Sequence, residues 1–266
     1  MNNTALFNRT RLLLGDEIFK AYTEKKVIIF GVGGVGSWAA EALVRSGISH
    51  LTIVDSDRVC ITNVNRQMMA TSKTVGMVKV EALKERLLEI NPEADIEAIQ
   101  AIYSAETASQ FDLDSYDFVI DAIDSLKDKA ELIINACLSK ARFFSSMGAA
   151  LKLDPTKISV AEFWKVKGCP LARALRQRFK RQHRFPAKKF LCVYSEELRE
   201  NKGKESSCGT DRCVCPKTTA GEGDPTLMNH EWCSSKAQIN GSLMHITAIF
   251  GLMLSGLVMR QVTSDE

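Results

Sequence analysis

The sequence contains no long uninterrupted apolar segment. Its most apolar stretch, residues 246–259, has 14 residues, whereas a helix that crosses a membrane needs about 20. We therefore expect a buried helix or a helix that faces a second copy of the chain, with membrane association as the alternative. The start of the chain also lacks an apolar core followed by small residues, so we expect no secretory signal and a cytoplasmic protein.

Cysteine is present, but not in the pairs that commonly hold zinc. None of the eight cysteines forms a Cys-x-x-Cys pair, and without a secretory signal we expect reduced thiols rather than disulfides. Three thiols are irregularly spaced in the segment "CGTDRCVC", namely Cys208, Cys213 and Cys215. Cys192 or His230 would supply the fourth ligand of a metal site there, but free thiols are the favoured interpretation. Cys60 and Cys137 are expected in the core.

Acidic residues are absent from residues 165–195, which carry ten lysines or arginines. Leu171, Leu175 and Phe179 recur every four residues and predict an amphipathic helix that ends before Pro186. The basic residues at helical spacing are Arg173, Arg176, Lys180, Arg181 and Arg184. A charge run is often only a solvated face, but the absence of acids leaves a local field that favours binding to nucleic-acid phosphates.

Apolar strands alternate with helices over the first part of the chain. The predicted strands are residues 26–30, 50–55, 117–121 and 142–148, and the predicted helices between them are about 34–46 and 75–90. The first of these segments form a βαβ unit. Because the strands are apolar almost without interruption, they predict a parallel sheet that is covered by helices on both faces.

We therefore predict an α/β fold: a Rossmann-like, doubly wound, mostly parallel sheet with a C-terminal extension of helices and loops. Residues 1–160 would form the nucleotide-binding domain. Residues 161–266 would contain the basic helix, a polar loop at about 199–231 and the final apolar helix, which packs in the core or at a dimer interface. No internal repeat is visible.

A glycine-rich turn directly follows the first strand. Gly31, Gly33 and Gly36 have the spacing of the dinucleotide fingerprint, and Asp55 ends the next strand, where an acid binds ribose hydroxyls. Glycines in such a turn, here also Gly34, let backbone N–H groups approach a phosphate at the start of a helix. Several nucleotides satisfy this pattern, which taken alone would favour an NAD-dependent oxidoreductase.

Polar residues after the second strand indicate a longer polyphosphate. They include Asp57, Asn63, Arg66 and Gln67. Lys79 follows at the start of a helix, where its ammonium group would reach the same phosphates. Asp124, just past a buried strand, suits Mg²⁺, which binds one or two carboxylates together with phosphate oxygens. Each residue alone has a structural explanation, such as a surface arginine or a capping aspartate, but together they favour ATP that is cleaved.

Four segments in this order resemble the ThiF, MoeB and ubiquitin-activating superfamily of ATP-dependent adenylating enzymes. They are "GVGGVGS", "VDSDRVCITNVNRQ", "VGMVKVEALKERLLEINP" and "DAIDS", all within residues 26–125. Over most of the chain, the sequence is most similar to the TcdA branch, the tRNA threonylcarbamoyladenosine dehydratases. The similarity is loosest over residues 196–230.

The resemblance implies a reaction in which a carboxylate attacks the α-phosphate of Mg·ATP and forms an acyl adenylate and pyrophosphate. In the TcdA branch, the carboxylate belongs to a threonylcarbamoyl group on an adenosine next to the anticodon of a tRNA. An internal nitrogen of the same group then displaces AMP, and a ring closes with net loss of water. The basic helix would accordingly contact tRNA.

The resemblance also implies roles for single residues. Asp55 would hold the ribose, whereas Asn63, Arg66 and Lys79 would hold the phosphates. Asp124 would bind Mg²⁺. These roles leave the glycine turn as the cradle for the phosphates.

A homodimer is implied as well, because family members use an N-terminal arginine from the partner subunit. Arg9 is the candidate here, with Arg11 as a substitute. Cys233 stands where the TcdA branch has a cysteine, so it is either a thiol that passes sulfur to an acceptor protein or a spectator.

Three alternatives remain open. The first is adenylation of the C-terminal glycine of a ubiquitin-like sulfur carrier, as in MoeB and ThiF. The missing Cys-x-x-Cys pairs, which those relatives commonly carry, and the basic helix argue against it. An NAD-dependent oxidoreductase would leave Asp124 without a role, and a non-catalytic tRNA-binding module would keep nucleotide only as structure.

Overall fold

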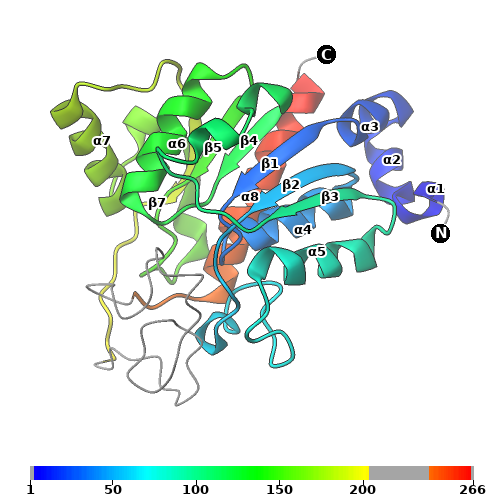
Figure 1. The fold of residues 1–266 in the computed structure, drawn as a ribbon, viewed down its shortest axis with the longest axis horizontal. Coiled ribbons are helices and arrows are strands. Elements are labelled where there is room, and N and C mark those ends of the chain that lie inside the picture. The colour runs from blue at the N-terminus through cyan, green and yellow to red at the C-terminus, as the bar shows by residue number, and fades with distance from the viewer. Residues whose placement is uncertain (1–2, 204–239, 265–266) are drawn as a thin grey trace.

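The computed structural model describes residues 3–203 and 240–264 (Figure 1). Its centre is a seven-stranded sheet in the order β3-β2-β1-β4-β5-β7-β6. The strands are β1 (Lys26–Phe30), β2 (His50–Val54), β3 (Asp95–Ile99), β4 (Phe118–Asp121), β5 (Arg142–Ser146), β6 (Ile158–Glu162) and β7 (Leu191–Ser195). Neighbouring strands are parallel, except β6 and β7, which are antiparallel. The predicted α/β fold with a doubly wound, mostly parallel sheet is confirmed.

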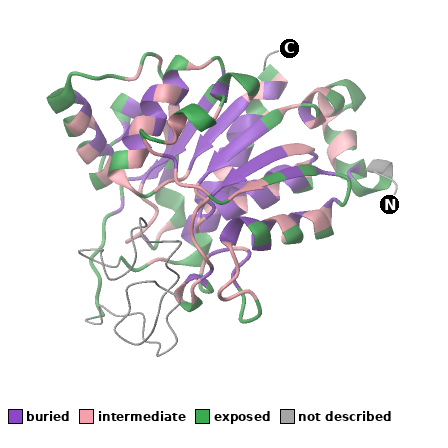
Figure 2. Cartoon of the chain, viewed as in Figure 1, coloured by how far each residue is buried: buried purple, intermediate pink, exposed green. Residues whose placement is uncertain are grey.

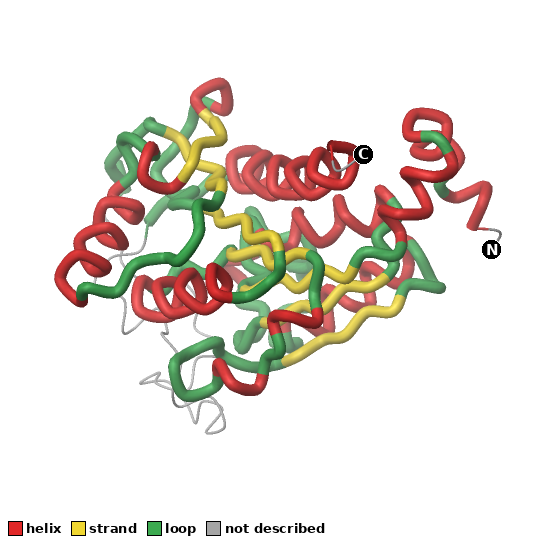
Figure 3. The backbone as a smooth tube through the Cα atoms, turned by 90° about the horizontal axis from the view of Figure 1, so that it is seen from above, coloured by secondary structure: helices red, strands yellow, loops and turns green. Residues whose placement is uncertain are grey.

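Helices cover both faces of this sheet (Figure 3). The α-helices of the described residues are α1 (Asn3–Leu6), α2 (Asn8–Leu14), α3 (Asp16–Thr23), α4 (Gly36–Ser46), α5 (Lys79–Ile90), α6 (Leu126–Leu138), α7 (Pro170–Gln182) and α8 (Met244–Ser264). Short 3-10 helices are η1 (Ile61–Asn63), η2 (Ala108–Gln110), η3 (Leu113–Ser115), η4 (Pro155–Lys157) and η5 (Phe163–Lys165).

The inner strands of the sheet are buried on both faces, and their successive apolar side chains point in opposite directions, whereas the edge strands β3 and β6 are partly exposed (Figure 2). Val27 and Ile29 of β1 belong to a core that also contains residues of α4, α5 and α8. Ile28 and Phe30 belong to a second core with residues of α6 and α7. This two-sided burial explains why the predicted strands lack polar alternation.

Strands β3, β6 and β7 were not predicted from the sequence. β7 pairs with β5 on one side and with β6 on the other, so residues beyond 160 complete the same sheet. The boundary expected at 160/161 falls inside β6, within a continuous sheet. The division into two domains stays a prediction.

Helix α5 begins at Lys79, four residues later than expected. Val78 is still extended and forms an isolated antiparallel bridge with Arg58. The Lys79 amide donates to the Asp57 carbonyl over 2.9 Å. The start of α5 is thereby fixed to the segment that follows β2.

Helix α8 packs closely across α4. A Cβ atom at Gly251 would lie 2.5 Å from the Val35 carbonyl oxygen and 2.8 Å from the Ala39 nitrogen, so only glycine permits this approach. The helix has 21 residues and is longer than the apolar stretch at 246–259. By length and composition α8 is able to cross a membrane, but 56% of its most apolar window is buried inside the protein. Its buried side agrees with the expected core helix.

Candidate nucleotide-binding site

The glycine turn between β1 and α4 is tightly packed against the end of β4. Gly31 has a φ of +85°, and a Cβ atom there would lie 2.8 Å from the Ala122 carbonyl oxygen. A Cβ atom at Gly36 would overlap the Gly31 carbonyl oxygen at 1.9 Å. Side chains at either position would therefore force the turn away from β4. At Gly31 and Gly36, two positions of the predicted motif, only glycine fits.

Gly33 and Gly34 lie beside the predicted phosphate-binding residues. A Cβ atom at Gly33 would lie 3.7 Å from Gln67 Nε2, and one at Gly34 would lie 3.3 Å from Arg66 Cγ. Gly34 also faces the start of α8, where Thr247 would be 3.2 Å from such an atom. The structure therefore brings Arg66 and Gln67 to the glycine turn, and it adds Thr247, which sequence patterns did not indicate.

Asp55 organises the turn through its two carboxylate oxygens. Oδ2 accepts a hydrogen bond from the Val32 amide over 2.8 Å, and Oδ1 accepts one from the Asp57 amide over 2.9 Å. Burial raises the pKa of the Asp55 carboxyl group, an effect that the charge of Lys79 opposes. Asp55 thus connects the end of β2 to the backbone of the glycine turn.

Lys79 is nearly buried between two carboxylates. Its Nζ lies 2.6 Å from Asp57 Oδ2 and 3.9 Å from Asp55 Oδ1. Burial alone would lower the pKa of Lys79, but the charges of Asp55 and Asp57 outweigh it and raise that pKa. Asp124 contributes in the same direction. The lysine is therefore protonated, within the electrostatic reach of all three predicted acids.

The segment after β2 is ordered by its own hydrogen bonds. Asn63 Oδ1 accepts from the Cys60 amide over 2.9 Å and caps η1. Arg66 Nη1 donates to the Thr62 carbonyl and to Asn65 Oδ1, both over 2.9 Å. Because Asn63 already holds the local fold, its contact with phosphate stays a prediction, as does that of Arg66.

Gln67 differs from its neighbours. It is buried beside Gly33, and within the described part of the chain its Oε1 has no hydrogen-bond partner. Buried amides without a partner are rare in proteins, and they often mark the place of an absent ligand or water. The predicted role of Gln67 in nucleotide binding is compatible with this arrangement.

A buried ion pair supports the turn that carries Asp124, and the sequence patterns did not reveal it. Asp121 and Lys129 are both fully buried, with Lys129 Nζ 2.7 Å from Asp121 Oδ2. Lys129 also donates to the Ile123 carbonyl over 3.0 Å, and the Ile123 amide donates to Asp121 Oδ1 over 3.0 Å. Ser145 of β5 donates to Asp121 Oδ2 over 2.6 Å. The pair therefore fixes the backbone N–H and C=O groups of Ile123, the residue just before Asp124.

The described residues contain no group of three or more His, Cys, Asp or Glu side chains that would hold a metal by itself. Asp124 is exposed at the carboxyl edge of the sheet, next to the glycine turn that β4 supports. Mg²⁺ that arrives with a nucleotide needs only one or two carboxylates from the protein. Asp124 fits such an ion, although its role as a ligand stays a prediction.

The basic helix forms where it was predicted. Leu175 and Phe179 of α7 are buried, whereas the side chains of Arg173, Lys180 and Arg181 are exposed. The apolar stripe therefore faces the core and leaves most of the basic stripe at the surface.

Two residues of the predicted basic stripe have partners within the chain. Arg176 Nη1 donates to the Phe163 carbonyl over 3.0 Å and to the Val166 carbonyl over 2.9 Å. Arg184 forms two hydrogen bonds with Glu131, of 2.5 and 2.8 Å. Arg176 therefore has a structural function, and Arg184 is neutralised in part.

The N-terminal arginines lie far from the glycine turn in their own chain. Helix α2 lies beside the amino-terminal end of β1, whereas the turn follows its carboxyl end (Figure 1). Arg11 is paired with Asp16 over 2.9 Å, and the side chain of Arg9 is exposed. Of the two arginines, Arg9 is therefore the better candidate for a contact with a partner subunit.

The cysteines divide into two groups. Cys208, Cys213, Cys215 and Cys233 lie outside the described residues, as does most of the predicted loop at 199–231. Cys137 and Cys192 are buried, the latter within β7. Cys60 was expected in the core but is only half-buried, because it precedes η1 at the edge of the sheet.

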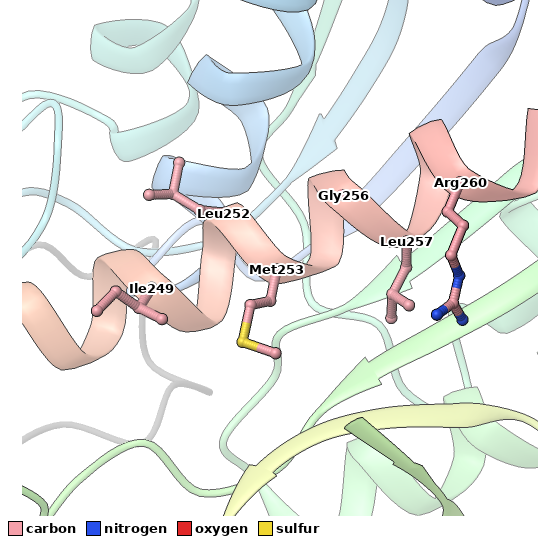
Figure 4. Close-up of a pocket in the computed structure, with 6 residues that line it drawn as sticks. All are labelled: Ile249, Leu252, Met253, Gly256, Leu257 and Arg260. Carbon is pink, nitrogen blue, oxygen red and sulfur yellow. The ribbon is translucent and has the colours of Figure 1, made fainter. Parts of the chain in front are cut away.

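An open, shallow apolar depression lies along the outer side of α8 (Figure 4). It is lined by Ile249, Leu252, Met253, Gly256, Leu257 and Arg260. None of these residues belongs to the glycine turn or to its polar neighbours. This apolar face of α8 is thus separate from the nucleotide-binding edge.

Comparisons with known proteins identify relatives over nearly the whole chain. The profile of the ThiF family matches residues 7–265. The tRNA threonylcarbamoyladenosine dehydratase of Escherichia coli is 40% identical over 174 residues, which span 65% of this chain and 65% of that protein. The protein of that name from Haemophilus influenzae is 36% identical over 233 residues, 85% of this chain and 80% of its own length.

Solved structures agree with these relatives. The crystal structure of the Escherichia coli enzyme with AMP has a TM-score of 0.80 and 30% identity, and the match covers 98% of this chain and 95% of that one. The structure of the same enzyme with ATP has a TM-score of 0.78, 29% identity and equal coverage. These complexes show that a protein of this fold and of similar sequence binds the adenine nucleotides expected here.

Proposed function

This chain belongs to the ThiF family, and from that premise we propose that it is an ATP-dependent tRNA threonylcarbamoyladenosine dehydratase. The carboxylate of the threonylcarbamoyl group would attack the α-phosphate of ATP, with release of pyrophosphate. An internal nitrogen of that group would then attack the activated carbonyl and displace AMP. The nucleoside thereby loses the elements of one water: a carboxylate oxygen leaves in AMP, and the attacking nitrogen gives up its proton. The observation that carries the proposal is the convergence of the glycine turn, Asp55, Lys79 and Asp124 at one edge of the sheet.

The glycine turn would bind the nucleotide phosphates through backbone N–H groups at the start of α4. Asp55 would bind the ribose: each carboxylate oxygen already accepts one amide hydrogen, and an ionised carboxylate has further lone pairs for two hydroxyl groups. The structure thus positions Asp55 before any ligand arrives, which reduces the entropy lost on binding.

Lys79 would stabilise negative charge on the α-phosphate as the carboxylate attacks. Its ammonium group makes one close contact, with Asp57, so that two of its three donors are left for oxygens of the nucleotide. Because it is buried and protonated, its charge acts in a medium of low polarity and is already oriented. Arg66 is expected to assist from the other side of the glycine turn.

Asp124 would hold Mg²⁺, which when bound neutralises charge on the phosphate oxygens. The Asp121–Lys129 pair fixes the peptide before Asp124 and thereby keeps this carboxylate in one place.

We also propose that the chain acts as a cytoplasmic homodimer. Arg9 lies at the opposite end of β1 from its own site, so it would act in the site of the partner subunit. The exposed apolar side of α8 offers a surface for such a partner (Figure 4). Mixing Arg9→Ala and Asp124→Ala chains tests this: recovery of AMP formation in the mixture supports donation between subunits, and no recovery contradicts it.

One experiment tests the function directly. The purified chain is incubated with Mg·ATP and tRNA that carries threonylcarbamoyladenosine, and AMP release and the mass of the nucleoside are measured. We expect AMP together with loss of the mass of one water. AMP release that requires a small carrier protein in place of tRNA would favour adenylation of a ubiquitin-like sulfur carrier instead. A role for Cys233 with a sulfur-acceptor protein stays a prediction.

A further inference from the structure

A small polar recess lies between α6 and α7, outside the nucleotide-binding edge. Its polar lining consists of Lys127, Glu131, Arg178, Gln182 and Arg184, and its volume is about 40 Å³. One water needs roughly 10–15 Å³, so the recess has room for a group larger than a single water. Three of the lining side chains are cations and one is an anion.

The cations of the recess are not all neutralised. Arg184 binds Glu131 through two hydrogen bonds, and these bonds lower the pKa of the Glu131 carboxyl group, which is therefore ionised and paired. Lys127 and Arg178 are the other two cations; neither side chain forms a hydrogen bond or salt bridge within the described residues, and the charge of Arg178 also lowers the pKa of Glu131. With Glu131 and Arg184 cancelling, the recess carries a net charge of two positive units.

Arg178 supplies an independent observation that favours an acceptor in the recess. Its Nε is buried, and in the part of the chain that the structure describes it has no hydrogen-bond partner. A buried donor without an acceptor destabilises the folded protein, and a charged donor does so more than a neutral one. An acceptor in the recess would remove this cost. Because the surrounding charge is positive, an anionic acceptor is favoured over a neutral one.

We propose that this recess binds one phosphate group of the tRNA substrate, an inference that rests on the proposed function. The α7 side of the recess belongs to the segment without acidic residues at 165–195, where the local field attracts polyanions, whereas its α6 side supplies Lys127 and the paired acid Glu131. Lys127 lies three residues after Asp124, so the recess begins beside the turn that carries the predicted catalytic carboxylate. A backbone phosphate near the modified adenosine would thus be held while its base reaches the nucleotide.

The structure also shows why Arg176 does not take this role. Arg176 is on α7 as well, but its guanidinium group is held by two carbonyl groups and lies 5.8 Å above the ring of Phe163. Arg178, two residues later, points to the α6 side of the helix and lines the recess. The sequence pattern had emphasised Arg176, whereas the geometry assigns the phosphate contact to Arg178 and Lys127.

The test compares Arg178→Gln and Lys127→Gln with a control, Lys20→Gln on the exposed side of α3. The dissociation constant for tRNA is measured over a series of salt concentrations, and ATP binding is measured separately. We expect each recess variant to weaken tRNA binding about tenfold and to reduce the slope of log K against log salt by about one. ATP binding by the two recess variants should match the wild type. Lys20→Gln should match the wild type in tRNA affinity, salt slope and ATP binding.

Several results would overturn the inference. Unchanged tRNA affinity and salt slope in both recess variants would show that only water fills the recess. Weaker binding with an unchanged slope would indicate a structural effect rather than a phosphate contact. Inorganic phosphate binding that Arg178→Gln abolishes, with tRNA affinity unchanged, would assign the recess to a free anion. If Arg178→Gln does not fold, Lys127→Gln on the exposed first turn of α6 decides.

The proposed dehydratase function and the proposed phosphate site are refuted by different results. Wild-type protein that binds tRNA but forms no AMP would refute the dehydratase activity, yet the salt series would still judge the recess. Wild-type protein that binds no tRNA would refute both.

Discussion

The two charged regions of this molecule are built in opposite ways. At the nucleotide edge, charges form close pairs: Lys129 and Asp121 are both fully buried, and the nearly buried Lys79 pairs with Asp57, whose side chain is partly exposed. On α7, Lys180 and Arg181 are exposed and have no nearby acid in sequence. Buried pairs are screened by salt much less and hold atoms in fixed positions, whereas exposed cations attract a distant polyanion and are strongly screened by salt. The first arrangement suits a small nucleotide that must react, and the second suits a polyanion.

Removal of the carboxylate predicted to bind the metal should have the largest effect on catalysis at the nucleotide edge. We expect Asp124→Ala to reduce AMP formation roughly 10²- to 10³-fold, because charge on the phosphates would lose a fixed counter-ion site. AMP is measured at saturating tRNA, and the melting temperature is measured in parallel. Asp95→Ala, at the opposite edge of the sheet, serves as the control. Normal AMP formation by Asp124→Ala would remove this residue from the site.

The buried pair can be broken in two ways that separate stability from positioning. Lys129→Met leaves Asp121 buried without a counter-charge and should lower the free energy of unfolding by about 3–5 kcal/mol. The double variant Asp121→Asn with Lys129→Met should recover much of that stability in urea unfolding. AMP formation should stay low in the double variant, because the Ile123 carbonyl has lost its donor. Full activity in the stable double variant would refute the positioning role.

The nucleotide half of the molecule could be predicted because its signals are local. The glycine spacing is read within one turn, although the Gly31 requirement itself comes from the distant Ala122, and the apolar strands are continuous, so spacing alone places Asp55 and Asp124 at the same edge. The buried Lys129 was missed, since a lysine near the start of a helix is typically solvated. Its one signal is the apolar run that follows in "AELIINACL".

The second half was less predictable because its contacts are distant in sequence. β6 and β7 are separated by residues 163–190, which include α7, so nothing local in the sequence indicates their antiparallel pairing. Periodicity placed Arg176 in a basic stripe, but it does not show that a guanidinium group turns back to carbonyl oxygens. Such side-chain directions follow from packing, not from spacing.

Two basic residues of α7 should therefore respond differently to neutralisation. Arg176→Gln removes two hydrogen bonds to carbonyl groups and should lower the free energy of unfolding by about 1–3 kcal/mol. Lys180→Gln should leave stability unchanged but weaken tRNA binding by about threefold and flatten its salt dependence. Urea unfolding and salt-dependent binding are measured for both. The reverse assignment of effects would mean that Arg176, not Lys180, contacts tRNA.

The smallest expected effect concerns Glu131, the one acid of the recess. Its pKa is lowered by the hydrogen bonds from Arg184, so this pair stabilises the folded state above the ordinary glutamate pKa of about 4.3 and loses its effect as pH falls. Glu131→Gln should therefore flatten the stability curve between about pH 5 and 3. It also frees Arg184 for phosphate, so tRNA should bind about two- to threefold more tightly at low salt. Weaker binding would show that the Arg184–Glu131 pair, rather than the cations alone, shapes the recess.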